Sequence, residues 1–202
     1  MLLAIDIGNT HIVTGILDNN GEVLLTFRVA SNDKLTEDEY FSYLRNISEF
    51  NKIDIKNIEG IIVASVVPNL ITIFQFLGKK YFHIDPMIVG PDIKIPFTFA
   101  PNLNPTGFGA DRIIDIVQSL NDYPDKNLVI FDLGSATTYE VLEKTVYVGG
   151  GILPGIEMSI NALFANTAKL PKVKFSTPES VLGKNTNEQI QAGIFYGYAG
   201  QI

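Results

Sequence analysis

The 202-residue sequence contains no cysteine and no tryptophan, and only two histidines, His11 and His83. Without cysteine there is no disulfide framework, no thiolate nucleophile and no cysteine-ligated metal. Two histidines that lie far apart in the sequence are too few to indicate a zinc centre. These absences exclude disulfide-stabilised proteins, thiol-dependent enzymes and the common zinc sites.

Positive charge and long apolar runs are also scarce. The chain has 15 Lys and Arg against 22 Asp and Glu, a net charge of −7, which argues against nucleic acid as a partner because such binding relies on basic patches. No stretch approaches the ~20 apolar residues that span a bilayer. The first residues are not typical of a signal peptide, since Asp6 interrupts a short apolar run that has no basic flank. We expect a cytoplasmic protein without a nucleic-acid or membrane partner.

What remains is an ordinary globular composition, 46% hydrophobic and 18% charged, enough for one good core or two small lobes. Periodicity predicts alternating strands and helices, which is typical of an α/β fold. Thr36 and Glu39 form a capping-box pattern that predicts a helix start. The expected strands are 2–6, 11–17, 22–29, 60–65, 128–131, 138–142 and 145–148. The expected helices are 36–47, 70–81, 109–120, 156–164 and 186–202.

One short motif occurs twice. Residues 6–10 (DIGNT) and residues 132–138 (DLGSATT) each follow a short apolar strand and lead into a second strand. Glycine lets the backbone approach a phosphate without a Cβ in the way, turn N–H groups can bind an anion, and the carboxylate can hold a cation. One such acidic turn is common, but its repetition favours two hairpins that face each other across a cleft and clamp nucleotide phosphates.

Three other features leave alternatives open. Asp111 and Arg112 follow Gly109 at a helix start, either as a helix-capping Asp with a surface Arg or as a general base beside an anion-binding guanidinium. The glycines at 149–151 end a strand and form either a tight turn or a bare backbone for a ligand. Gly193 and Gly197 lie beside a stripe of Ile190, Ile194, Tyr198 and Ile202, which permits close helix packing within the core or at a subunit interface.

The nucleotide motifs of other folds are missing. The sequence has no GxxxxGK[ST] and no GxGxxG, and its paired motifs lie between strands rather than between a strand and a helix. The P-loop and Rossmann classes therefore fit poorly.

In combination, the motifs closely resemble the type III pantothenate kinase family of the acetate kinase, sugar kinase, Hsp70 and actin superfamily. The matching segments, in order, are residues 6–10, 64–68 (ASVVP), 109–112 (GADR), 132–138, 149–155 (GGGILPG), 167–171 (TAKLP) and 183–186 (GKNT). The resemblance covers nearly the whole chain, and the set of motifs is specific although no single one is.

The resemblance implies two actin-like (ribonuclease H-like) α/β lobes with a nucleotide cleft between them. The first lobe would comprise residues 1–122 and the second residues 123–202, the latter incomplete because the family pattern continues beyond Ile202. It also implies ATP-dependent phosphorylation of the primary hydroxyl of pantothenate, the first step towards coenzyme A, by a homodimer.

The resemblance further assigns roles to particular residues. The ATP-binding residues would be Asp6, Ile7, Gly8, Asn9, Thr10, His11 and Ser135. The pantothenate-binding residues would be Gly109, Ala110, Asp111, Arg112 and, across a dimer interface, Thr186. Asp111 would be the catalytic base, Asp6 would position Mg²⁺, and Asp132 would bind a monovalent cation, K⁺ or NH₄⁺.

Two positions depart from the family pattern, and two other functions compete. Ser135 replaces a threonine and keeps its hydroxyl, whereas Glu140 replaces an aspartate and adds a methylene.

One alternative function is that of a non-catalytic or regulatory relative that binds a nucleotide or small molecule, which retention of Asp6, Asp111 and Asp132 opposes. The other is a kinase of the same superfamily with a different acceptor, which the GADR and GGGILPG segments oppose.

Overall fold

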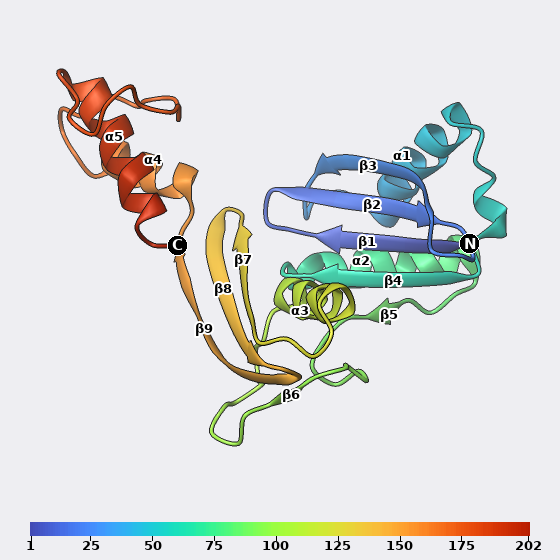
Figure 1. Ribbon diagram of the computed structural model, residues 1–202. Coiled ribbons are helices and arrows are strands. Elements are labelled where there is room, and N and C mark those ends of the chain that lie inside the picture. Colours follow the sequence, from blue (N-terminus) through green and yellow to red (C-terminus); the bar gives the residue numbers. More distant parts are fainter. The chain divides into compact units, whose positions relative to one another are not determined.

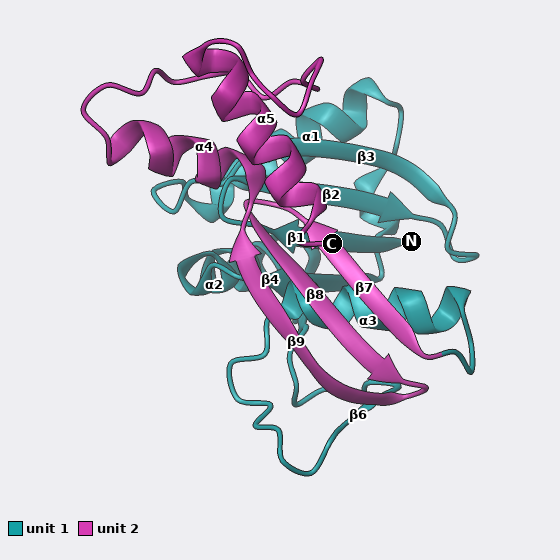
Figure 2. Cartoon of the chain, turned by 60° about the vertical axis from the view of Figure 1, so that its left-hand side comes forward, with its two compact units in different colours: residues 1–126 teal, residues 127–202 magenta.

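A computed structural model describes residues 1–202 and divides them into two compact units, Met1–Lys126 and Asn127–Ile202 (Figure 2). Each unit contains a β-sheet and helices, as the alternation of patterns in the sequence predicts. None of the helices is long and apolar enough to cross a membrane.

The sheet of the first unit has five strands in the order β3-β2-β1-β4-β5 (Figure 1). The strands are β1 (Leu2–Ile7), β2 (His11–Leu17), β3 (Val23–Ala30), β4 (Gly60–Ser65) and β5 (Met87–Ile88). The first three form an antiparallel meander, and β4 lies parallel to β1 with Ile7 opposite Ser65. This register brings the end of β4 beside the loop that follows β1.

Helices cover both faces of this sheet (Figure 1). They are α1 (Glu37–Phe50), η1 (Ile55–Asn57), α2 (Pro68–Leu77), the π-helical turn η2 (Gly78–Phe82) and α3 (Ala110–Asp122), and a short strand β6 (Thr98–Phe99) precedes α3. Leu3, Ile5 and Ile7 of β1 share a buried core with residues of α1 and α2. Because side chains alternate along a strand, Ala4 and Asp6 point to the opposite face. Ile62 of β4 also points to that face, where it lines a groove with Ile113 of α3.

Helix starts in this unit follow the sequence closely. The Thr36 side chain accepts a hydrogen bond from the Glu39 N–H, and the Glu39 carboxylate accepts one from the Thr36 N–H at 2.8 Å, so the predicted capping box is confirmed. Helix α2 begins at Pro68 rather than at residue 70, because proline is well suited to the first helical position, where no N–H partner is needed.

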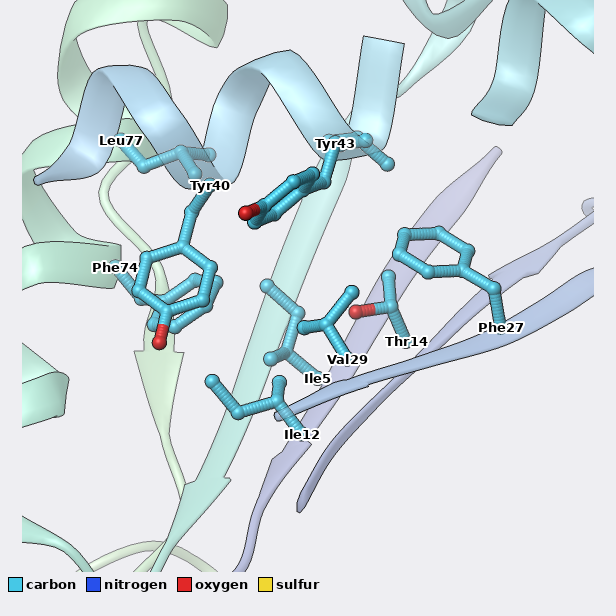
Figure 3. Close-up of a pocket in the computed structure, with 10 residues that line it drawn as sticks. Ile5, Ile12, Thr14, Phe27, Val29, Tyr40, Tyr43, Phe74 and Leu77 are labelled. Atoms are coloured by element: carbon cyan, nitrogen blue, oxygen red, sulfur yellow. The ribbon is translucent and has the colours of Figure 1, made fainter. Parts of the chain in front are cut away.

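The core under the sheet contains one small cavity, shown in Figure 3, which Thr14, Tyr40 and Phe74 help to line. Its volume is about 10 Å³, which is close to the minimum that holds a single water. The cavity is therefore a packing gap between the sheet and the two helices, and no organic ligand fits there.

The second unit begins with three consecutive antiparallel strands, β7 (Leu128–Leu133), β8 (Ala136–Glu143) and β9 (Val146–Pro154). Helices α4 (Ile156–Ala165) and α5 (Thr186–Ala199) follow and pack against each other through Ile160, Val173 and Ile190. In Figure 1, β7, β8 and β9 form the lower part of this unit, and α4 and α5 form its upper part.

The expected end of a strand at the triple glycine is wrong, because β9 continues through residues 149–151 to Pro154. Gly150 lies opposite Glu140 and Gly151 opposite Tyr139. A Cβ on Gly151 would overlap the Tyr139 ring, and a Cβ on Gly150 would overlap the Tyr139 carbonyl. Gly150 and Gly151 therefore accommodate neighbouring groups of β8 inside a strand and form neither a tight turn nor a bare surface, whereas Gly149 has a φ of 149° and no such neighbour.

The last helix differs from the expected one at its end. Helix α5 stops at Ala199 and is capped by Gly200, so Ile202 lies outside it and is exposed. Tyr198 and Ile190 are buried, as their spacing predicts. No heavy atom lies within 4 Å of a Cβ built on Gly193 or Gly197, so these glycines do not serve close packing within the chain.

Candidate active site

The loop after β1 is held by backbone hydrogen bonds from three directions. The Gly8 N–H donates to the His11 carbonyl at 2.9 Å, the Ser31 N–H donates to the Thr10 carbonyl at 2.9 Å, and the Val66 N–H donates to the Ile7 carbonyl at 3.0 Å. Asn9 and Thr10 are exposed between these fixed points. The result is a rigid turn with accessible polar groups directly after Asp6.

The segment beside this loop is ordered by its own side chain. The Ser65 hydroxyl accepts a hydrogen bond from the Val67 N–H at 3.0 Å and lies 3.0 Å from the Val67 carbonyl. This turn at the end of β4 leads directly into Pro68 and α2. The structure thus brings residues 6–10 and 64–68, which are far apart in the sequence, to the same edge of the sheet.

The second hairpin repeats the first turn in outline. The Gly134 N–H donates to the Ala136 carbonyl at 3.0 Å, and Asp132 lies opposite Thr138. The Gly155 N–H, at the start of α4, donates to the Ser135 carbonyl at 3.2 Å. A Cβ on Gly155 would overlap the carbonyl oxygens of Gly134 and Ser135. The last glycine of the GGGILPG segment is therefore required by the close approach of this turn.

Asp111 lies in the first turn of α3, where its carboxylate faces the backbone of the helix start. Its Oδ1 accepts a hydrogen bond from the Arg112 N–H at 2.8 Å. A Cβ on Gly109, the residue before the helix, would overlap this same oxygen. The glycine thus leaves room for a carboxylate whose charge complements the positive end of the helix dipole. The side chain is partly exposed, so a substrate can reach it.

Arg112 is positioned by aromatic rings. Its guanidinium carbon lies 4.1 Å from the centroid of the Phe108 ring, a distance typical of a cation–π contact. Phe108 packs edge-on against Phe99 at 5.1 Å, and Phe99 packs against the buried Phe97 at 5.5 Å. This row of rings restricts a long side chain and orients a planar cation that can pair with a carboxylate in two hydrogen bonds.

Asp6 and α3 occupy the same face of the first sheet. Asp6 projects away from the core that Leu3, Ile5 and Ile7 share with α1 and α2, and α3 lies on that opposite face (Figure 1). Both Asp6 and Asp111 can therefore act on ligands bound on the α3 side.

The remaining predicted site residue lies in the second unit. Thr186 is the first residue of α5 and is exposed, directly after Asn185, whose side chain caps the helix by accepting from the Glu188 N–H at 3.1 Å. Farther along α5, the Tyr198 and Thr137 hydroxyls are hydrogen-bonded, and both side chains are buried. This bond joins α5 to β8, the strand that follows the second hairpin turn.

The structure has no cluster of three or more histidine or acidic side chains arranged to hold a metal by themselves. Asp6 and Asp132 are both exposed carboxylates next to turns between strands. Such single carboxylates fit Mg²⁺ in kinases, because Mg²⁺ completes its coordination with water and substrate phosphates.

Reasoning from the sequence missed three parts of the site: the ring row behind Arg112, the steric need for Gly155, and the hydrogen bond of Tyr198. Phe108 directly precedes the GADR segment and Pro154 directly precedes Gly155, so neighbouring residues in the sequence pointed to the ring row and to Gly155. The Tyr198 contact joins residues 61 positions apart, and no neighbouring residue pointed to it.

Comparison with known proteins identifies relatives along the whole chain. The profile of the type III pantothenate kinase family matches residues 2–202. A type III pantothenate kinase from Fusobacterium nucleatum is 66% identical over 202 residues, which are 100% of this chain and 79% of that protein.

A solved structure shares the fold. The Campylobacter jejuni protein, described as a member of the Baf family of transcriptional activators, is 20% identical and superposes with a TM-score of 0.55, covering 98% of this chain and 76% of that one. An identity of 20% supports a conclusion about the fold alone. With the two sheets of the structure, the similarity confirms the predicted α/β class. The match of the profile and the identity to the Fusobacterium protein establish that the chain belongs to the type III pantothenate kinase family.

Proposed function

We propose that the protein is a kinase that transfers the γ-phosphoryl group of ATP to the primary hydroxyl of pantothenate, the first step of coenzyme A biosynthesis. The observation that carries this proposal is the identity of 66% to a type III pantothenate kinase over the full chain. A non-catalytic relative is not favoured, because Asp6, Asp111 and Asp132 are all present and accessible.

Phosphoryl transfer depends mainly on positioning and on neutralising charge. The turn at residues 8–10 offers backbone N–H groups and polar side chains to the phosphates of ATP, and Ser135 offers a hydroxyl from the second turn. Asp6 would hold Mg²⁺ and Asp132 a monovalent cation, K⁺ or NH₄⁺. These ions supply positive charge that offsets the developing charge on the phosphates.

Asp111 is the proposed general base. Its carboxylate is fixed by the N–H of Arg112 at 2.8 Å and by the space that Gly109 leaves, so one oxygen is held while the other can accept the proton of the pantothenate hydroxyl. The Arg112 guanidinium, held against Phe108, would bind the carboxylate of pantothenate. Gly109 and Ala110 would form the wall of the same pocket.

We also propose a homodimer in the cytoplasm, with Thr186 of each chain contacting pantothenate bound to its partner. Two observations support the dimer: Thr186 is exposed at the start of α5, and the open space beside Gly193 and Gly197 leaves that helix free for close packing with another chain. The proposed lobes, residues 1–122 and 123–202, lie close to the two compact units Met1–Lys126 and Asn127–Ile202.

The test is ADP release that depends on pantothenate, with the product identified as phosphopantothenate by mass spectrometry. Asp111→Asn should lower kcat by roughly a hundredfold to ten-thousandfold, the usual contribution of a general base, with little change in the thermal midpoint. Asp122→Asn, at the far end of the same helix, is the matched control and should keep full turnover. Undiminished turnover in Asp111→Asn would remove it as the base. Turnover with another hydroxyl compound but not with pantothenate would refute the substrate.

A further inference from the structure

A large groove lies on the first unit, away from all motif residues. It has a volume of about 690 Å³ and is lined by residues of α1, η1 and η2 and the turn between α1 and η1. We call it the basic groove, after its four basic rim residues Arg45, Lys52, Lys56 and His83. The Glu59 N–H, just after η1, bonds to the Met1 carbonyl, which places η1 at the end of the sheet where β1 begins. Asp6 and its loop are at the other end of β1.

The floor of the basic groove is apolar and partly aromatic. The rings of Phe41 and Tyr81 stack at 3.6 Å with an angle of 3°, and Phe82 packs edge-on against Phe41 at 6.0 Å. Ile53 and Ile55 complete the floor and are half-buried. Tyr81 is fixed because its hydroxyl donates to Asp38 at 2.6 Å. An aromatic or aliphatic body therefore finds a preformed surface here.

The rim carries more positive than negative side chains, although the whole chain has a net charge of −7. Arg45, Lys52 and Lys56 are exposed and take part in none of the salt bridges of the structure. Two carboxylates also line the groove, Glu49 and Asp54. The Asp54 carboxylate already accepts a hydrogen bond from the Lys56 N–H at 3.0 Å and caps η1. The rim thus has three exposed lysine and arginine side chains against two carboxylates, one of which is engaged in capping η1.

Two of the basic residues occupy backbone positions that favour glycine. Lys52 has φ of 60° after α1, and His83 has φ of 59° after η2. Both lie at helix ends where a glycine in the left-handed conformation is usual. Among the four non-glycine residues with positive φ, these two line the same groove. The two helix ends therefore place a lysine and a histidine at the rim of the groove, where glycine would cost less.

We propose that the basic groove binds a small organic anion, one that joins an aromatic or aliphatic body to a phosphate or sulfonate group. The volume falls within the ~300–1,000 Å³ typical of small-molecule sites, which combine an apolar lining with a few placed polar groups. The body would lie on Phe41, Phe82 and Ile53, and the anionic group would contact the rim cations. This inference is independent of the proposed kinase activity.

The test uses anilinonaphthalene sulfonate as a fluorescent probe and decyl phosphate as a competitor, with uncharged decanol for comparison. The double variant Lys52→Gly with His83→Gly removes two rim side chains and relieves the strained backbone, so its thermal midpoint should not fall. Lys144→Gly is the matched control, because Lys144 also has a positive φ, of 55°, but lies in a hairpin turn of the second unit. A second variant, Arg45→Gln with Lys56→Gln, removes exposed charge without touching the backbone.

We expect the wild type and Lys144→Gly to bind the probe equally, and each double variant to bind it about tenfold more weakly, as the loss of two exposed charge contacts implies. Decyl phosphate should displace the probe better than decanol, and added salt should weaken binding. Pantothenate-dependent ADP release should be unchanged in all variants. The proposal is overturned if the probe does not bind, if both double variants bind it as the wild type does, or if ATP with pantothenate displaces it.

Discussion

The two acidic hairpins have nearly the same turn but different support. In each, a glycine N–H bonds back across the turn, to His11 in the first unit and to Ala136 in the second. The first turn is held by backbone bonds from Ser31 and Val66. The second contacts the start of α4 through Gly155 and is followed by a strand that Tyr198 of α5 holds by its hydroxyl.

The difference shows that one local motif can be fixed in two ways. In the first unit the turn is held by backbone hydrogen bonds from two neighbouring segments, and the Ser65 hydroxyl orders the one that contains Val66. In the second, besides the backbone bond from Gly155 to the Ser135 carbonyl, the support depends on the missing Cβ of Gly155 and on one pair of buried hydroxyls. We therefore expect the second hairpin to be the more sensitive of the two to single substitutions at its turn and its supports, and the predictions below test this expectation.

The largest effect should separate the two carboxylates. Asp6→Asn should lower turnover about a hundredfold or more and raise the Mg²⁺ concentration needed for half-maximal rate, because a metal contact contributes several kcal/mol. Asp132→Asn should instead reduce the stimulation by K⁺ relative to Na⁺ at saturating Mg²⁺. Steady-state rates over titrations of each ion distinguish the two. Identical ion profiles for both variants would mean that the hairpins do not hold different cations.

The next effect concerns steric support. Gly155→Ala places a methyl group against the carbonyls of Gly134 and Ser135. It should therefore lower the free energy of unfolding by about 1–3 kcal/mol, and kcat should fall in the same variant. In Gly8→Ala, the nearest atom is the His11 carbonyl oxygen at 3.2 Å, and the loss should be smaller. Urea denaturation of both variants gives the comparison. A larger loss in Gly8→Ala would reverse the order of sensitivity proposed above.

A smaller effect is expected at the buried hydroxyl pair. Tyr198→Phe leaves the Thr137 hydroxyl without this partner, which should cost about 1–2 kcal/mol. Adding Thr137→Val should recover part of the loss, since no buried hydroxyl then remains at that contact. The double-mutant cycle is measured by thermal unfolding, and additive losses would show that the two side chains are not coupled. A raised KM for pantothenate in Tyr198→Phe, with kcat retained, would link this contact to the position of Thr186.

The smallest effect is a pH dependence confined to the first unit. Hydrogen bonds from the Lys80 ammonium and the Tyr81 hydroxyl hold the pKa of the Asp38 carboxyl below its usual range. A lowered pKa in the folded state stabilises the protein above the pKa of the unfolded chain, and this contribution is lost as the pH falls through the folded value.

Asp38→Asn should therefore be less stable than the wild type near neutral pH, with the difference shrinking on acidification below about pH 4. Hydrogen exchange resolves this by region: protection of α1 should respond, and protection of β7–β9 should not. A difference that stays constant with pH would show that the ionised form of Asp38 is not the stabilising one.

The amino-acid sequence by itself determined most of the local structure and the family. The apolar runs before Asp6 and Asp132 specify strands, Thr36 with Glu39 specifies a helix start, and the spacing of Ile190, Ile194 and Tyr198 specifies a helix, because these signals act between residues a few positions apart. The GADR segment specified the position of Asp111 at a helix start for the same reason.

Tertiary structure alone decided the rest. The glycines at 149–151 were expected to end a strand, because the contact that requires Gly150 and Gly151, with Tyr139 and its carbonyl, belongs to the neighbouring strand. The pairing of β1 with β4 joined residues 6–10 to residues 64–68, and the packing of Phe99 and Phe108 fixed Arg112. These contacts join residues that are distant in the chain, and their energies depend on burial and close approach, which no local pattern of residues encodes.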